Sequence, residues 1–411
     1  SRTTTDSGRA YLSTPSQIYY QRPGVALMTT PALRTIIAPI RAGQLTIAIQ
    51  REELPLESCV TYATRQNPRR LYLFVSKVLG KHWPARPRVM RDVHCRLAAK
   101  IAHLPGPMLV IGLAETATAL GRGVAEEAAL LTGRDDILYL QTTRYQLDRP
   151  LAFSFDESHS HAPEHTVYLP DTGLQPLFFA ARSLILVDDE ISTGRTLAEL
   201  AKAYLAINPN LEQIAFACIT NWLNAAHRKE LIRRLERSLL FPALIEGSFQ
   251  FEPDCTFPSP ALPLFVANLN RNHDHVIADP ARTGLMAGRR MNPPSFCEKA
   301  RMKASGRSLT VIGTGEYAYA PFRIALAWEE AGHDVLFQST TRSPILVGDA
   351  IASRREFLDN YGDGLPNYLY NLDSDRLPIV IYEHPAMLDL HSLADELDGQ
   401  AFCGETACLA S

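Results

Sequence analysis

Residues 184–196 bring together side chains that could bind a phosphorylated sugar. An apolar run ends in the carboxylates of Asp188 and Asp189, and a short segment rich in Ser, Thr and Gly follows it. Adjacent carboxylates can accept hydrogen bonds from two vicinal hydroxyls, such as those of a ribose. A hydroxyl-rich turn before a helix offers hydroxyls, backbone N–H groups and the positive end of the helix dipole to a phosphate. The order of residue types therefore predicts a site for a ribose phosphate.

The elements that must position this site follow from the hydrophobic spacing. Beyond the turn, apolar residues recur on one helical face: Leu197, Leu200, Ala201, Tyr204 and Leu205. Strand and helix patterns alternate, with strands expected at 108–112, 137–141, 184–187 and 214–219. Such alternation predicts an α/β fold in which a mostly parallel sheet is flanked by helices. Ligands of such sheets bind at the carboxyl ends of the strands, where the acidic pair falls.

The segment resembles the 5-phosphoribosyl-1-pyrophosphate (PRPP) binding motif of the type I phosphoribosyltransferases. The resemblance implies that Asp188 and Asp189 hold the ribose hydroxyls. The rest of the motif would bind PRPP chiefly through its 5-phosphate: Glu190, Ser192, Thr193, Gly194, Arg195 and Thr196. Departing pyrophosphate carries several negative charges, so we expect Mg²⁺, held mainly by PRPP and water rather than by a dedicated metal motif.

Two further segments are expected to meet the pyrophosphate. Type I enzymes place a pyrophosphate loop after the first core strand, which assigns that role to Leu113, Ala114, Glu115 and Thr116. A carboxylate is unexpected there because like charges repel, so Glu115 should act through a cation or face the base. Arg144 follows the next strand, and its guanidinium is suited to clamping a phosphate.

Residues 142–170 occupy the place of the loop that closes over PRPP in type I enzymes. This loop carries four residues that could do chemistry: Glu157, His159, His161 and His165. Their spacing matches no standard zinc motif. We expect a role as lid contacts or in acid–base catalysis. A solvated loop and a transition-metal site are the alternatives.

The N-terminal part, residues 31–105, is expected to form a hood over the acceptor base, as in these enzymes. Residues 71–84 are predicted to be helical until Gly80 and Pro84 end the helix. Lys77 and Lys81 would then share one face, next to His82. They form either a basic patch that faces the phosphates or the acceptor, or a solvated surface.

The chain also repeats itself. Residues 110–119 and 311–320 are identical at six of ten positions, and Thr-Thr-Arg follows each of them, at 142–144 and 340–342. Residues 379–383 occupy the place of 186–190 without the acidic pair or the hydroxyl-rich loop. We interpret this as a degenerate duplicate that has lost its PRPP motif. The alternative is two unrelated β/α units with similar loops.

The second copy resembles the TRSP domain, which follows phosphoribosyltransferase domains in proteins associated with bacterial tellurium-resistance and stress-response operons. The tetrapeptide that names this domain stands at 341–344. An anion or acceptor site is expected at its loops: Gly313, Thr314, Gly315, Glu316, Thr341, Arg342 and Ser343.

The predicted organisation has four parts: a flexible segment 1–30, a phosphoribosyltransferase domain 31–250, a Pro-rich linker or arm 251–297, and a smaller α/β TRSP domain 298–411. A net charge of −3 argues against nucleic-acid or membrane-surface binding. The chain lacks an apolar run long enough to span a membrane. Seven scattered cysteines fit free thiols in a reducing cytoplasm.

These observations predict a cytoplasmic, Mg²⁺-dependent phosphoribosyltransferase that transfers ribose 5-phosphate from PRPP to an unidentified base or other nucleophile. A role in a nucleotide-like biosynthetic pathway is expected, and the fold allows a homodimer. The alternatives are a non-catalytic regulator that binds PRPP or a nucleotide, and a bifunctional enzyme whose second segment acts on the product.

Overall fold

The structure is a computed structural model. It describes residues 33–155, 165–258, 260–261, 272–288 and 306–404. The predicted flexible segment 1–30 lies outside the described residues, as do the candidate loop residues Glu157, His159 and His161.

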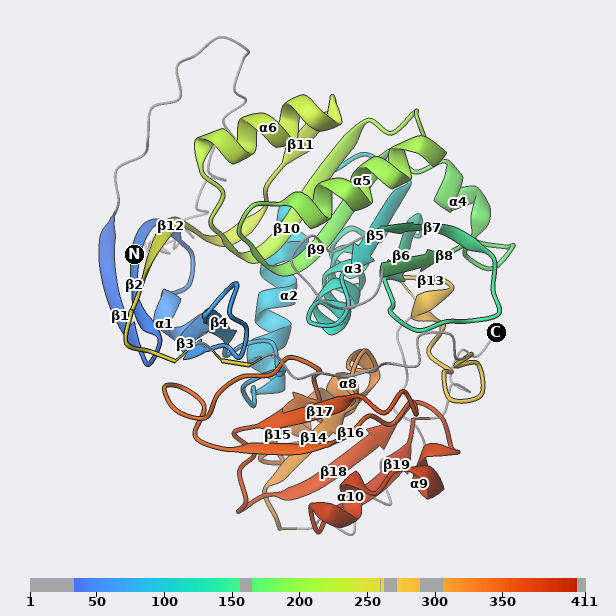
Figure 1. Cartoon of the computed structure of the whole chain (residues 1–411). Coiled ribbons are helices and arrows are strands. Elements are labelled where there is room, and N and C mark those ends of the chain that lie inside the picture. Colours follow the sequence, from blue (N-terminus) through green and yellow to red (C-terminus); the bar gives the residue numbers. More distant parts are fainter. Residues whose placement is uncertain (1–32, 156–164, 259, 262–271, 289–305, 405–411) are drawn as a thin grey trace, which may run out of the picture. The chain divides into compact units, whose positions relative to one another are not determined.

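One large sheet carries the acidic motif. Its strands in the described residues follow the order β1-β2-β12-β10-β9-β5-β6-β13, with β11 beside β10 (Figure 1). The bounds are β1 Arg34–Ile40, β2 Gly43–Glu52, β5 Met108–Gly112, β6 Ile137–Gln141, β9 Ser183–Ile191, β10 Gln213–Asn221, β11 Ser238–Leu240, β12 Ala243–Pro253 and β13 Leu285–Met286. The strands from β6 through β12 pair in parallel, whereas β1, β2 and β13 add antiparallel edges. The prediction of a mostly parallel α/β sheet is confirmed.

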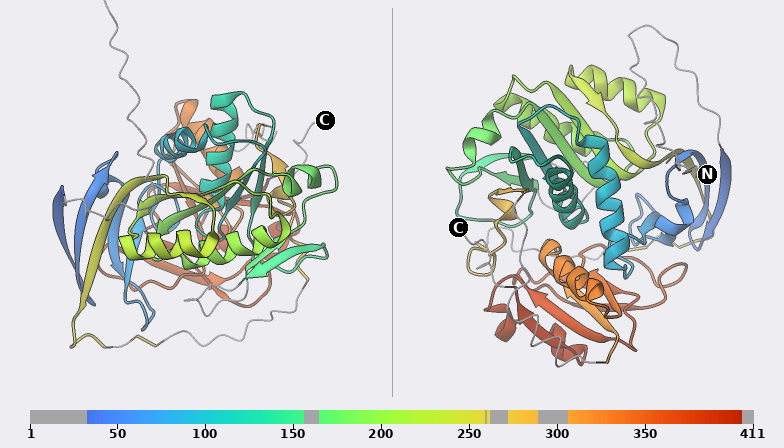
Figure 2. Two further views of the ribbon diagram at one scale, coloured as in Figure 1. Left: turned by 90° about the horizontal axis from the view of Figure 1, so that it is seen from above. Right: turned by 180° about the vertical axis from the view of Figure 1, so that it is seen from behind.

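Helices cover both faces of this sheet, as a parallel sheet requires. On one face lie α2 (Pro87–Ile101) and α3 (Thr118–Thr132), and on the other lie α5 (Arg195–Ile207) and α6 (Ala225–Leu235) (Figure 2). Two short helices complete this part, α1 (Leu56–Cys59) and α4 (Gln175–Phe179). None of the helices in the described ranges is both long enough and apolar enough to cross a membrane.

The segment predicted as a helix at 71–84 is instead a strand followed by turns. β3 (Val60–Thr64) and β4 (Tyr72–Ser76) form an antiparallel hairpin. Phe74 of β4 packs 5.0 Å, centroid to centroid, from Trp222. Gly80 then turns the chain with a φ of +69°. The helix prediction was wrong because aromatic packing and strand pairing outweighed a weak helical pattern.

Residues 306–404, called the second half below, build a smaller sheet with the order β15-β14-β18-β19. Its elements are β14 Leu309–Gly313, α8 Tyr319–Glu330, β15 Val335–Ser339, β16 Arg354–Leu358, β17 Pro366–Tyr370, β18 Leu377–Tyr382, α9 Met387–Leu390, α10 Leu393–Glu396 and β19 Gln400–Cys403. The same order, β6-β5-β9-β10, occurs in the large sheet. Each half also has a hairpin, formed by β7 (Leu151–Phe155) with β8 (His165–Tyr168) and by β16 with β17. This correspondence is what a duplication predicts.

The strand register corrects one detail of the predicted repeat. Leu186 lies opposite Ile111, whereas Val380 lies opposite Ile312, the repeat partner of Ile111. Leu186 therefore corresponds to Val380, and the match of 186–190 to 379–383 was wrong by one residue. The counterpart of Asp189 in the second half is Glu383.

Part of the predicted Pro-rich arm, 251–297, is built into the fold. β12 extends as far as Pro253, a one-turn 3₁₀ helix spans Pro280–Arg282, and β13 pairs with β6. The two halves also share a hydrophobic cluster, in which Met90 of α2 and Ala119 of α3 join Phe322 of α8.

Gly123 provides a test of how closely α2 and α3 pack. A Cβ added there would lie 2.1 Å from Nδ1 of His94, which is buried on α2 and packs edge-on against Phe322. We expect Gly123→Ala to lower the free energy of unfolding by about 1–3 kcal/mol through overpacking. Alanine gains roughly 1 kcal/mol over glycine within a helix, and the expected loss is what remains after the cost of overpacking has exceeded this gain. Urea unfolding measures the change.

Gly173→Ala is the matched control, because a Cβ added there meets no atom within 4 Å. A Gly123→Ala protein as stable as the unaltered one would contradict this packing.

Candidate active site

The acidic pair lies at the carboxyl end of β9, beside the N-terminus of α5. Asp188 and Asp189 are half-buried, as are Ser192 and Thr193 in the turn that follows. Gly194 caps α5 with a φ of +70°, a left-handed conformation that suits glycine. This geometry directs the first N–H groups of α5, which lack intrahelical partners, toward the same edge as the carboxylates.

In the rest of the motif, Thr196 is half-buried in the first turn of α5, and Arg195 is exposed beside it. Glu190 is half-buried near the end of β9 and forms an ion pair with Arg70. The structure therefore gathers the predicted PRPP motif at one strand end, apart from the outward-facing Arg195.

The loop between β5 and α3 stands directly against the acidic pair. The hydroxyl of Thr116 donates to Oδ1 of Asp189 at 2.9 Å. The backbone N–H of Leu113 donates to the carbonyl of Val187 at 3.0 Å, and the Ala114–Glu115 peptide is cis. These contacts bring the predicted pyrophosphate loop and the predicted ribose site together.

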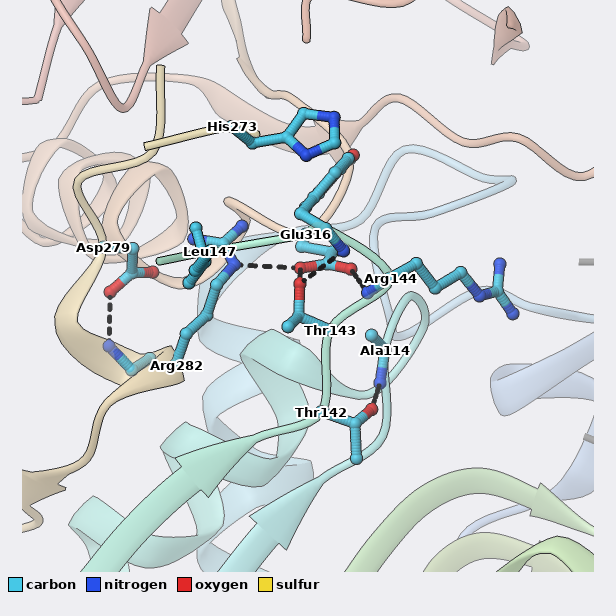
Figure 3. A network of polar contacts seen from close by, with 12 residues as sticks. Ala114, Thr142, Thr143, Arg144, Leu147, His273, Asp279, Arg282 and Glu316 are labelled. Atoms are coloured by element: carbon cyan, nitrogen blue, oxygen red, sulfur yellow. Dashed lines mark hydrogen bonds and ion pairs between the residues drawn. The ribbon is translucent and has the colours of Figure 1, made fainter. Parts of the chain in front are cut away.

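Thr142 and Arg144, which follow β6, line the other side of this loop. The hydroxyl of Thr142 accepts a hydrogen bond from the N–H of Ala114 at 2.8 Å (Figure 3). His165, buried on β8, lies 3.2 Å from this hydroxyl through Nδ1 and 3.3 Å from Nη2 of Arg144 through Nε2. A guanidinium can only donate, so Nε2 of His165 is the acceptor in this contact. His165 therefore lies between the hydroxyl of Thr142 and the guanidinium of Arg144.

The charge of Glu115 is compensated by cations. Nζ of Lys81 lies 3.0 Å from Oε1 of Glu115, and the N–H of Arg342 donates to Oε2 at 3.3 Å. Burial acts to raise the pKa of Glu115, but the charges of Lys81, Arg144 and Arg342 outweigh it and lower the pKa below its ordinary value. An ionised Glu115 can therefore be accommodated in the loop, because its partners come from segments far away in the sequence.

A small pocket adjoins the acidic pair on the side of the β3–β4 hairpin. It is lined by Val60, Phe74, Ser76, Asp189, Glu190, Ile219 and Thr220. Glu190 forms an ion pair with Arg70 at 2.7 Å. Burial raises the pKa of Glu190, and the charge of Asp189 adds to this rise against the opposing effect of Arg70.

The three basic residues predicted for the hood do not form one patch. Nζ of Lys77 donates to the carbonyl of Glu57 at 2.9 Å. Lys81 is 2% exposed and binds Glu115 together with the carbonyls of Gly315 and Thr340. His82 is buried beside Tyr370. This correction follows from the strand and turns that replace the predicted helix.

The candidate residues of the second half lie against the first half. The N–H of Gly315, two residues after the end of β14 at Gly313, donates to Thr340 Oγ1 at 2.8 Å. The carboxylate of Glu316 accepts from the hydroxyl of Thr143 at 2.6 Å and from the N–H of Arg144 at 2.9 Å. The remaining candidates adjoin this contact: Thr314 and Thr341 are buried, and Arg342 and Ser343 are part-buried.

The partners of the second half's carboxylates carry no signal in the sequence. Arg282 is fully buried and bridges Glu316, at 3.0 Å, and Glu383, at 2.9 Å. The hydroxyl of Tyr361 donates to Glu383 at 2.6 Å. Arg282 lies in the Pro-rich segment, where no periodicity marked it. Glu383, the counterpart of Asp189, is therefore paired with the guanidinium of Arg282.

Comparison with known families gives two matches that together cover most of the chain. Residues 59–248 match the model described as phosphoribosyl transferase, and residues 290–397 match the model described as the TRSP domain C-terminal to it. No curated protein sequence matches the chain.

Solved structures with a similar arrangement include two adenine phosphoribosyltransferases. The enzyme from Giardia lamblia is 17% identical, with a TM-score of 0.28 over 38% of this chain and 80% of that one. The enzyme from Trypanosoma brucei is 14% identical, with a TM-score of 0.33 over 46% and 77%. The orotate phosphoribosyltransferase of Francisella tularensis is 13% identical, with a TM-score of 0.25 over 38% and 66%.

Proposed function

Because the chain joins a phosphoribosyltransferase domain to a TRSP domain, we propose that it catalyses Mg²⁺-dependent transfer of ribose 5-phosphate from PRPP to an acceptor nucleophile. The observation that carries this proposal is the 2.9 Å hydrogen bond between Thr116 and Asp189. It supports the proposal because the proposed pyrophosphate loop and the proposed ribose-binding carboxylate lie side by side, as the C1–pyrophosphate bond of PRPP would require.

Each part of PRPP has a matching group. The turn at Ser192–Thr196 and the N-terminus of α5 would hold the 5-phosphate. Asp188 and Asp189 would accept hydrogen bonds from the ribose hydroxyls. The 113–116 loop and the guanidinium of Arg144 would hold the pyrophosphate.

The half-buried carboxylates of Asp188 and Asp189 also suit a hydrated Mg²⁺ that is shared with the phosphates of PRPP. Within the part of the chain that the structure describes, no cluster of three or more His, Cys, Asp or Glu side chains could hold a metal ion. In this proposal, phosphate oxygens of PRPP and water supply the other ligands. When bound, Mg²⁺ would neutralise charge on the departing pyrophosphate.

The reaction is a substitution at C1 of the ribose. The bond from C1 to pyrophosphate breaks with both electrons leaving on oxygen, while a lone pair of the acceptor forms the new bond. The intervening state resembles an oxocarbenium ion, which the carboxylates would stabilise. We propose that Glu190, whose pKa is raised by burial and which adjoins Asp189, takes up the proton of the acceptor.

Calorimetric titration with PRPP, with and without Mg²⁺, tests this function. We expect the double variant Asp188→Asn, Asp189→Asn to bind PRPP at least 100-fold more weakly. Hydrogen bonds to charged groups contribute about 1.5–3 kcal/mol each, which corresponds to roughly 10- to 100-fold in affinity.

Asp135→Asn is the control, because this exposed carboxylate precedes β6 at the opposite end of the strands. If the unaltered protein binds PRPP but releases no pyrophosphate with any acceptor in a broad screen, the chain is a sensor. If it does not bind PRPP at all, the proposal fails.

A further inference from the structure

The two copies of the repeat use the same local hydrogen bonds. In the first, Thr142 Oγ1 accepts from the N–H of Ala114 at 2.8 Å. In the second, Thr340 Oγ1 accepts from the N–H of Gly315 at 2.8 Å. In each copy of the repeat, therefore, the first threonine of Thr-Thr-Arg fixes a loop. This loop follows β5 in the first copy and β14 in the second.

The loop carboxylates, in contrast, reach across to the other half. Glu316 of the second half accepts from the N–H of Arg144, the arginine of the first Thr-Thr-Arg, at 2.9 Å. Glu115 of the first half accepts from the N–H of Arg342, the arginine of the second, at 3.3 Å. The exchange is reciprocal, so the loop of each half is completed by the other half.

The contact made by Glu316 is the stronger one and requires a carboxylate. Its two oxygens accept from the hydroxyl of Thr143 at 2.6 Å, the N–H of Arg144 at 2.9 Å and Nε of Arg282 at 3.0 Å (Figure 3). All three partners are donors, and Glu316 is 3% exposed. An amide in its place would turn an NH₂ group toward at least one donor, and buried mispairing of this kind is costly.

Glu316 is also connected to the interior of the second half through Arg282. Arg282 joins Glu316 to Glu383, which is nearly fully buried and also accepts from Tyr361. The backbone at 143–144 is thus tied through buried ion pairs to the core of the second half. Glu316 of the second half therefore limits how far the backbone of Arg144 can move from the proposed pyrophosphate loop.

We propose that the second half is a structural part of the pyrophosphate site and that Glu316 is its positioning residue. Glu316 does not touch pyrophosphate. It fixes the 142–144 segment, so that Thr142 meets Ala114 and the guanidinium of Arg144 is held ready for the leaving group. This inference rests on the proposed function, and it assigns the TRSP domain a role in binding the donor rather than in binding a separate ligand.

The test compares two fragments of the donor by calorimetry: pyrophosphate with Mg²⁺, and ribose 5-phosphate. We expect Glu316→Gln to weaken pyrophosphate binding at least tenfold and to change ribose 5-phosphate binding less than twofold. General loss of structure would weaken both, so the difference between the two ligands isolates positioning. Glu330→Gln is the matched control, since Glu330 ends α8 in the same half and pairs with Arg91 at the surface.

If Glu316→Gln does not fold, Thr143→Val provides the same test, because it removes one donor to Glu316 from a buried side chain of similar shape. Pyrophosphate binding equal to that of the unaltered protein in the folded variant would overturn the inference alone. Failure of the unaltered protein to bind either fragment would overturn the proposed function and the inference with it.

Discussion

Replacing Arg282 with methionine should lower the free energy of unfolding by about 3–5 kcal/mol, the usual cost of breaking a buried ion pair from one side. The substitution keeps most of the apolar stem and removes the charge. Glu316 and Glu383, at 3% and 1% exposure, would then be left with uncompensated buried charges. In the native protein these two carboxylates hold the pKa of Arg282 above its usual value, although burial acts to lower it.

Urea unfolding near neutral pH measures the loss. Arg233→Met is the control, because Arg233 is 72% exposed and pairs with Glu230 within α6. We expect it to cost less than about 0.5 kcal/mol. A loss below about 1 kcal/mol for Arg282→Met would contradict the buried arrangement.

The protein should lose stability in mild acid because two histidines are buried in the neutral state. Burial lowers the pKa of His82 to about 3, with a contribution from Lys81. Burial also lowers the pKa of His94 to about 3, with contributions from Arg323 and Arg91. The unfolded chain takes up these protons near the ordinary value of 6.5, well before the folded chain does.

The direction in which the free energy of unfolding changes with pH follows from this order of protonation. Stability is at its full value above pH 6.5 and decreases as the pH falls from 6.5 toward 3. At about pH 5 each histidine should have cost about 2 kcal/mol, or about 4 kcal/mol together. The carboxylate of Glu115, whose pKa is lowered, adds its own loss only below its ordinary value of 4.5.

Free energies of unfolding measured between about pH 7 and pH 5 test this prediction, with His94→Gln and His82→Gln as comparisons. Each variant should show a smaller slope against pH than the unaltered protein, whatever its stability near neutral pH. Parallel slopes would contradict the neutral, buried state of these imidazoles.

Several features of the fold and the site could be predicted from contiguous residues. The strand, turn and helix around Asp188 and Asp189 are local, and their hydrophobic periods are visible in a dozen residues. The repeated Thr-Thr-Arg pointed to two related halves, and the same strand order occurs in both. Where a pattern was weak, the prediction failed: residues 72–76 form a strand because Phe74 packs on Trp222, a contact between distant segments.

Neighbouring residues were enough to predict the resemblance of the first domain to phosphoribosyltransferases, the α/β architecture and the position of the acidic motif at a strand end. The pairing of the buried charges depends instead on contacts between distant segments. Glu115 was unexpected in the predicted pyrophosphate loop, and the structure shows Lys81 and Arg342 beside it. Arg282 had no local signal, yet it joins Glu316 and Glu383. A charge is stable in the interior only where a partner meets it, and that partner is brought by the packing of distant segments, which no local pattern encodes.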